Sequence, residues 1–162
     1  MTTQAGDARR LLRHTLATVA YRGAKACRGV PPGFSTFRLG EGTRTPGEIL
    51  AHLGDLFAWA LTLANGKAAW VAAEPGAWDD DVARFLSLVR QLDEALARGQ
   101  PLACGDEQLF QGPIADALTH IGQLALLRRR AGAPVRGENY FVAAIEVGRV
   151  GADQAAPRRE FD

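Results

Sequence analysis

The segment 45–66 has every sequence signal of an amphipathic helix, and it constrains the fold more than any other part of the chain. Thr45 suits the N-cap, Pro46 the first helical position and Glu48 the third, which together form a capping box. Apolar residues then recur at three- and four-residue spacing until Asn65-Gly66 stops the helix. A helix with one apolar face has to bury that face, so we expect other helices to pack against it.

Three further segments repeat apolar residues at helical spacing, from about 7 to 28, from about 79 to 99 and from about 112 to 132. The acidic run Asp79 to Asp81 suits the positive end of a helix, and the basic run Arg128 to Arg130 suits the negative end. No segment alternates apolar and polar residues in the manner of a strand. These patterns predict an all-α protein, organised as a four-helix bundle.

One domain accounts for most of the chain. We expect the bundle to occupy residues 1–152 and to end in a short extra C-terminal segment at 139–150, either a helix or an irregular covering. The long connection at 30–45 permits a non-sequential order of the helices. The polar residues 153–162 are expected to form a frayed tail.

Composition excludes several classes of protein. The 162 residues carry a formal net charge of +1, which gives no strong field to attract nucleic acid or a membrane surface. The longest largely apolar run, 56–64, is far too short for a bilayer span, and no secretory signal is apparent. Cys27 and Cys104 form no metal or redox motif. We expect a cytoplasmic protein with reduced thiols that binds neither nucleic acid nor membranes.

Asp116 and His120 are the residues best placed to carry chemistry. They stand four positions apart in the last predicted helix, so both side chains project from the same side and can reach one ion. His52 lies at the edge of the apolar face of the 45–66 helix. If the two helices pack together, His52, Asp116 and His120 form a two-histidine, one-carboxylate metal site with open coordination positions. Such ligands suit zinc or nickel first, and also iron or manganese.

Structural roles compete with this metal hypothesis. An acid and a histidine four residues apart are a common pair on helix surfaces, and His52 can be an ordinary boundary histidine. His14 can be a fourth ligand, a partner of a ligand or a proton carrier, although a lone histidine is more often structural. Glu138 belongs to a segment that can fold over the site or anchor a loop, and we favour the anchor. Gln123 can hydrogen-bond a ligand or water, or simply pack between helices.

Two segments resemble the DinB/YfiT-like superfamily of four-helix-bundle metalloproteins. The first is TPGEILAHLGDLFAWAL at 45–61, which is similar to the family's second helix, where an inward histidine precedes an apolar and aromatic stretch. The second is ADALTHIGQLALLRR at 115–129, which is similar to the last core helix with its pattern His-x-x-x-His-Arg-Gly-Gln. His120, Gly122 and Gln123 match that pattern.

The chain departs from the family pattern at two positions. Asp116 stands where the first histidine of the pair usually stands, and Ile121 replaces the arginine. A carboxylate is still a competent metal ligand, although it changes the preference among metals. The resemblance therefore implies a divalent metal bound by His52, Asp116 and His120.

The resemblance also implies an activity. Related families carry out thiol-dependent S-transfer, isomerisation or hydrolysis on a small molecule, in which a divalent metal lowers the pKa of a low-molecular-weight thiol. The sequence has no identifiable thiol-binding motif, so the substrate stays open. The alternative is a non-catalytic helical protein that binds a ligand or responds to stress. Three tryptophans and helices rich in alanine and leucine also predict a homodimer.

Overall fold

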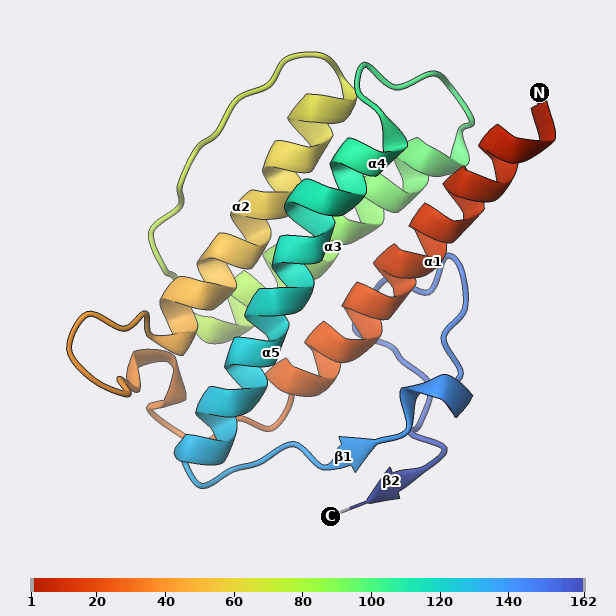
Figure 1. Cartoon of the computed structure of the whole chain (residues 1–162). Coiled ribbons are helices and arrows are strands. Elements are labelled where there is room, and N and C mark those ends of the chain that lie inside the picture. The colour runs from red at the N-terminus through yellow and green to blue at the C-terminus, as the bar shows by residue number, and fades with distance from the viewer. Residues whose placement is uncertain (1, 162) are drawn as a thin grey trace.

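The chain folds into four long helices that pack side by side (Figure 1). The computed structural model describes the backbone of residues 2–161 and the side chains of residues 6–161. Within that part of the chain the long helices are α1 (Thr2–Cys27), α2 (Pro46–Ala64), α3 (Trp78–Ala97) and α5 (Ala115–Arg130). The prediction of an all-α protein is confirmed, and α1 begins some five residues earlier than its apolar pattern predicts.

Short elements connect and extend these helices. A helical stretch before α5 consists of α4 (Asp106–Leu109) and the π-helical turn η2 (Phe110–Ile114), and η1 (Phe34–Thr36) precedes α2. The C-terminal region contains η3 (Tyr140–Val142) and two strands of two residues each, β1 (Gly137–Glu138) and β2 (Glu160–Phe161). Of the two alternatives for residues 139–150, the irregular segment is therefore the correct one.

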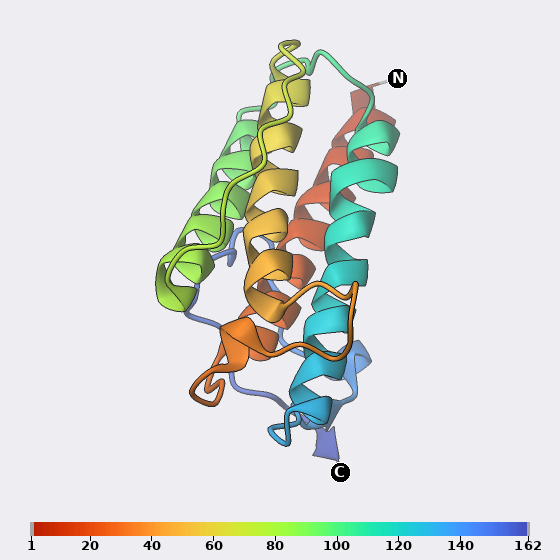
Figure 2. The same cartoon turned by 90° about the vertical axis from the view of Figure 1, so that its left-hand side faces the viewer.

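The helices do not follow one another around the bundle in chain order. Trp78 at the start of α3 donates a hydrogen bond to the carbonyl of Cys27 at the end of α1, so these two helices are antiparallel. Beyond the end of α3, Ala103 donates to the carbonyl of Ala64, the last residue of α2, so α2 and α3 are parallel. The connection 65–77 therefore runs back along the length of α2 (Figure 2). Helices α1 and α2 each pack on α3 and α5, so the 30–45 connection joins opposite corners of the bundle, in the non-sequential order that the sequence permits. The 65–77 connection adds the parallel crossover from α2 to α3.

The core lies between the four helices and is aliphatic and aromatic. Leu16 of α1, Leu53 and Phe57 of α2 and Phe85 of α3 are fully buried, and the rings of Phe57 and Phe85 lie 5.8 Å apart. A Cβ at Gly23 would meet the Phe85 ring at 2.8 Å, so α1 approaches α3 closely only because that position is glycine. Burial of this core supplies the main driving force for the bundle.

The N-terminal part of the last helix differs from the sequence prediction. Gly112-Pro113 reads as a helix start, but the helical stretch begins at Asp106, and Pro113 lies inside η2. Proline lacks an N–H donor, and the widened π turn accommodates the resulting break in the hydrogen-bond ladder. The turn leads directly into α5, where Asp116 occupies the first turn.

The C-terminal residues are ordered, in contrast to the frayed tail that the sequence predicts. Glu160 and Phe161 pair with Glu138 and Gly137 as antiparallel strands. Glu160 also forms an ion pair with Lys25 of α1, with Nζ and Oε1 2.9 Å apart. Tertiary pairing thus supplies hydrogen bonds that the polar sequence of the tail does not reveal.

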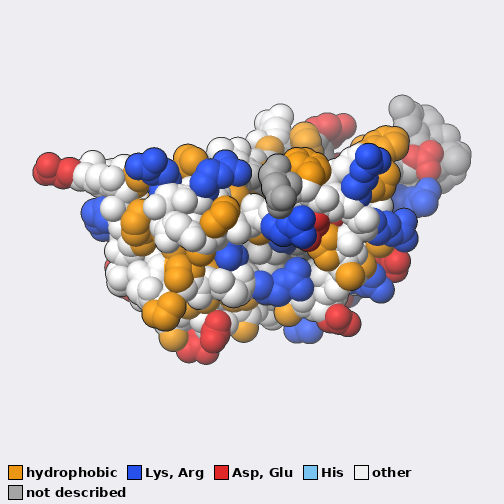
Figure 3. Space-filling view, turned by 90° about the horizontal axis from the view of Figure 1, so that it is seen from below, with side chains coloured by type: hydrophobic (Ala, Val, Ile, Leu, Met, Phe, Trp, Pro, Cys, Tyr) orange, Lys and Arg blue, Asp and Glu red, His pale blue; other side chains and the backbone are white. Residues whose placement is uncertain are grey.

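Basic side chains gather at the end of the bundle where α1 and α5 finish. Figure 3 shows Lys and Arg side chains across the middle of this face, with acidic side chains mostly toward its edge. Arg128 is buried there, and its guanidinium donates to the carbonyls of Ala26 and Gly29 at the end of α1. This cation complements the negative end of the α1 dipole. None of the helices among the described residues combines the length and apolarity needed to span a bilayer.

Candidate metal centre

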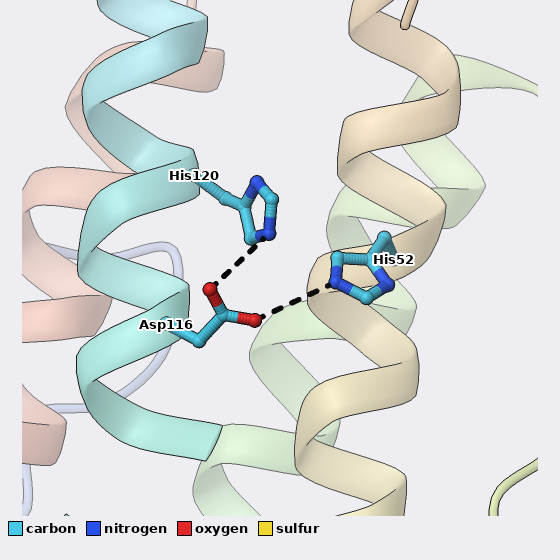
Figure 4. A group of neighbouring side chains, drawn as sticks. All are labelled: His52, Asp116 and His120. Atoms are coloured by element: carbon cyan, nitrogen blue, oxygen red, sulfur yellow. Dashed lines mark ion pairs between the residues drawn. The ribbon is translucent and has the colours of Figure 1, made fainter. Parts of the chain in front are cut away.

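The structure brings His52, Asp116 and His120 together between α2 and α5 (Figure 4). The Nε2 atom of His52 lies 3.7 Å from Oδ2 of Asp116, and Nε2 of His120 lies 3.5 Å from Oδ1 of the same carboxylate. The two imidazole rings are nearly perpendicular, with centroids 4.7 Å apart. One ligand atom from each residue lies within 4.8 Å of the other two. The three residues that the sequence selects are thus neighbours in space.

This spacing fits a divalent ion. Bonds of about 2.0–2.2 Å from a tetrahedral metal to nitrogen and oxygen place neighbouring donor atoms about 3.4 Å apart. The two imidazole-to-carboxylate distances are close to that value. The third separation, between the two histidine nitrogens, is at most 4.8 Å. Two imidazoles and a carboxylate are also the donor set that zinc, nickel, iron and manganese accept. The residues present therefore fit such a metal.

Local structure explains how the triad forms. Asp116 and His120 are one helical turn apart on α5, so their side chains project together. His52 extends from the partly buried edge of α2, while Leu53 and Phe57 of the same helix enter the core. The contact between α2 and α5 then closes the distance between the two imidazoles.

Burial decreases from the histidines to the carboxylate. The side chains of His120 and His52 are 11% and 19% exposed, whereas that of Asp116 is 48% exposed. Burial, followed by the charges of His120 and Arg44, lowers the pKa of His52 below its ordinary value. A lowered pKa favours neutral imidazole, which is the form that binds a metal. The group is therefore buried on its nitrogen side and open to solvent on its oxygen side.

Gln123 orients the ring of His120. Its side-chain oxygen lies 2.7 Å from Nδ1 of His120, so this nitrogen donates the hydrogen bond and carries the ring proton. The lone pair of the neutral ring is then on Nε2, which faces Asp116. The sequence offered Gln123 a hydrogen bond to a ligand or water, or a packing role between helices, and favoured packing. In the structure Gln123 is exposed and its partner is the His120 imidazole. Such a partner holds a metal-binding histidine in one tautomer.

Trp70 forms an aromatic wall beside the triad, and sequence reasoning did not assign it to the site. Its ring lies 5.5 Å from that of His52 and 5.8 Å from that of Trp59. Trp70 belongs to the 65–77 connection, which is held to α2 by the backbone N–H of Ala73 donating to the buried Asp55 carboxylate. Its only sequence signal is an aromatic residue in an otherwise small and polar loop.

A groove of about 360 Å³ opens beside His120. Leu39 and Ile49 line one side, and Leu126 and Leu127 line the other. Arg44, immediately before the N-cap of α2, also faces this groove. The sequence gave no reason to include Arg44 in the site. The groove thus adjoins the triad at His120, with largely apolar walls and one arginine.

The other residues that the sequence raised lie outside the triad. His14 is exposed on α1 and lines a separate shallow depression with Val147. Glu138 is buried and accepts hydrogen bonds from Tyr21 and Lys25, so the anchor interpretation is the correct one. Both cysteines are free thiols. Burial raises the pKa of Cys27 to about 12, which leaves it protonated and unreactive.

No protein family model, no curated protein and no solved structure matches this chain. The similarity to the DinB/YfiT-like superfamily therefore depends on the two short motifs alone and stays a prediction. The function of this protein has to be inferred from the geometry of the triad.

Proposed function

We propose that this protein binds one divalent first-row metal ion through His52, Asp116 and His120 and acts on a small molecule at that ion. The observation that carries the proposal is the convergence of two imidazoles and a carboxylate within 4.8 Å from two separate helices. Zinc and nickel suit this donor set best, followed by iron and manganese. The likeness of the two motifs to DinB/YfiT-like proteins supports the same assignment.

The openness of the site favours a metal that exchanges ligands over a purely structural one. Structural zinc sites are usually closed by four protein ligands, whereas catalytic sites keep a position for water or substrate. Here three residues supply the donors, and Asp116 is about half exposed. The groove beside His120 gives a small molecule a route to the remaining positions.

The residues of this chain have distinct tasks in such a reaction. A bound divalent ion supplies Lewis acidity and lowers the pKa of a water or thiol that binds to it. His52 and His120 fix the position of the ion from two helices, and Gln123 keeps His120 in the tautomer that presents Nε2. The Trp70 ring lies beside one side of the His52 imidazole and contacts Trp59 in turn. We propose thiol-dependent transfer, isomerisation or hydrolysis as the reaction class, by the resemblance of the motifs.

Metal content tests the proposal directly. Wild-type protein dialysed against buffered Zn²⁺ or Ni²⁺ should retain one ion per chain by elemental analysis. The change His120→Ala should lower metal affinity by more than about 100-fold, since a direct ligand contributes more than the outer partners whose loss costs 10–100-fold. His14→Ala is the matched control, because it removes an exposed histidine that lies outside the triad. Equal metal retention by the two variants would contradict the assignment.

Tryptophan fluorescence gives a second readout. Trp70 lies close enough to His52 for a paramagnetic ion such as Ni²⁺ or Co²⁺ in the triad to quench its emission. Quenching should saturate at one equivalent, and Trp70→Phe should remove most of the change. Quenching that persists at full amplitude in Trp70→Phe would place the ion elsewhere.

Self-association remains a proposal of the sequence. Several large apolar side chains of the described residues are exposed, among them Val71 at 74% and Phe141 at 96%. Surfaces of this kind are commonly covered by a partner. We propose a homodimer, which light scattering at micromolar concentration tests, because a monomeric mass would contradict it.

A further inference from the structure

We infer that the groove beside the triad is a binding site for the carboxylate of a small-molecule ligand, with Arg44 as the residue that recognises it. The inference rests on the proposed function, since the same ligand would reach the ion held by His52, Asp116 and His120. It adds a substrate class, a small organic acid, and a specificity-determining residue that the triad alone does not supply.

Arg44 is available to a ligand. It lines the groove together with His120, and within the described residues it makes no hydrogen bond or ion pair. Arg38, on the same connection, contrasts with it, because Arg38 donates to the carbonyl of Thr43 and pairs with Glu48. These contacts of Arg38 hold the 30–45 connection in place. The Arg44 guanidinium, which has no such contact among the described residues, is left facing the groove.

Arg44 is also close to the triad. Arg44 and His120 of the triad line the same groove of about 360 Å³. A ligand that spans the groove can therefore place one donor atom at the metal position and an anionic group at Arg44. Guanidinium binds carboxylates through two parallel hydrogen bonds, which fixes the orientation of the ligand as well as its charge.

The walls of the groove favour a singly charged organic acid over a phosphate. Leu39 and Leu126 are exposed by 44% and 49%, and Ile49 and Leu127 lie behind them, so a ligand meets apolar surface between the two polar ends. Arg44 is the single arginine among the described residues lining the groove, which include no lysine. One cation balances one carboxylate, whereas a phosphate carries more charge and more acceptor oxygens than this lining satisfies. The volume of about 360 Å³ lies at the small end of ligand pockets and suits a metabolite-sized molecule.

Matched thiol probes test the inference on Co²⁺-loaded protein. A thiolate bound to Co²⁺ gives a charge-transfer absorption, so its dissociation constant is measured directly. We compare γ-mercaptobutyrate with its neutral isostere γ-mercaptobutyramide and with γ-mercaptopropylphosphonate. The chain of these probes is too long for the thiol and the second polar group to chelate one ion efficiently. Wild-type protein should bind the carboxylate about tenfold more tightly than the amide, the size expected for one charge-assisted hydrogen-bonded pair.

Variants of Arg44 separate this site from the metal site. Arg44→Gln should keep full Co²⁺ content and bring the carboxylate-to-amide preference close to one, while Arg44→Lys should keep part of it. Arg90→Gln is the control, because it removes an exposed arginine of α3, which packs on α1 and α2. An unchanged preference in Arg44→Gln, or a stronger preference for the phosphonate, would overturn the carboxylate site and leave the metal site standing. Failure of wild-type protein to hold Co²⁺ would overturn the proposed function, and this inference with it.

Discussion

Two polar clusters of this bundle each combine carboxylates with basic side chains, but they differ in how closely these groups are paired. In the cluster formed by Tyr21, Lys25, Glu138 and Glu160, which we call the anchor cluster, every charged group has an opposite partner. The Lys25 ammonium lies 2.6 Å from Glu138 and 2.9 Å from Glu160, and the Tyr21 hydroxyl donates to Glu138 at 2.6 Å. In the triad, by contrast, the closest approaches of Nε2 to the carboxylate are 3.5 and 3.7 Å. These are separations at which a third atom fits between the partners.

The difference separates structural from functional polarity in one small protein. The anchor cluster joins α1 to β1 and β2, so its charges are used to hold the C-terminal region against the bundle. The triad joins α2 and α5 at a place that is open to a groove. A cluster whose donors and acceptors satisfy one another has little capacity left for a ligand, whereas convergent ligand atoms without close partners have such capacity. Stability and metal measurements should therefore respond oppositely in the two clusters.

The largest stability effect is expected in the anchor cluster. Glu138→Ala removes the carboxylate that pairs with Lys25 and leaves the Tyr21 hydroxyl buried without its acceptor. Losing one partner of a buried ion pair costs about 3–5 kcal/mol, and we expect about 3 kcal/mol because Glu160 still pairs with Lys25. Urea denaturation measures this change. Glu146→Ala, which removes an exposed carboxylate of the same C-terminal region, is the control. A similar loss of unfolding free energy in both variants would show that the anchor cluster does not stabilise the fold more than a surface ion pair does.

The next effect belongs to the triad and depends on metal. A ligand that binds only the folded state at 100 times its dissociation constant stabilises it by about 2.7 kcal/mol. Adding Zn²⁺ at that ratio should raise the melting temperature of wild-type protein and of Glu138→Ala. His52→Ala should show no such rise, while its stability without metal stays close to that of wild type. A rise of equal size in His52→Ala would mean that the ion stabilises the fold from another place.

A smaller effect is expected from the residue that orients His120. Gln123→Ala removes the acceptor at Nδ1 and frees the ring to change tautomer, so metal affinity should fall by about tenfold. Isothermal titration calorimetry measures the affinity. Gln91→Ala, which changes an exposed glutamine of α3, should leave the affinity unchanged. If the two variants bind alike, Gln123 does not position the ligand.

The two clusters should also lose stability in different pH ranges, which is the smallest effect. Burial lowers the pKa of His52 below its ordinary 6.5, so the unfolded state binds the proton more readily. Stability of the metal-free protein should therefore fall as pH decreases from 6.5 toward the folded-state pKa. The hydrogen bond from Lys25 lowers the pKa of Glu160 below 4.5, so its contribution is present above that pH and is lost below it.

Two variants check these ranges. His52→Asn should flatten the stability profile in the upper range alone, and Glu160→Gln should flatten it in the lower range alone. Guanidinium denaturation across the pH series gives both profiles. An effect of either variant in the other range would show that the clusters are coupled and not independent.

Features that depend on neighbours in sequence were predictable. The capping box of α2 forms as predicted, with Thr45 accepting from the Glu48 N–H and Glu48 accepting from the Thr45 N–H. The pairing of Asp116 with His120 follows from helical geometry in the same way, because the two residues are one turn apart. The position of His52 at the edge of the apolar face of α2 made it a candidate, and the resemblance of 45–61 to a metalloprotein helix supported it. The approach of α2 to α5 needed the structure.

The sequence alone, then, determined which segments are helical, where α2 begins and which two residues of α5 share a face, because hydrogen bonds and side-chain period within one helix depend on residues a few positions apart. Only the tertiary structure decided the crossover of 65–77, the burial of Arg128 against the end of α1, the pairing of Lys25 with Glu138 and the placement of Arg44 beside the triad. Arg128 illustrates the reason: the basic run suits the negative end of its own helix, but this guanidinium binds carbonyls at the end of α1, about 100 positions away. Contacts at such separations depend on how the apolar faces pack, and the local pattern of polar residues carries no record of them.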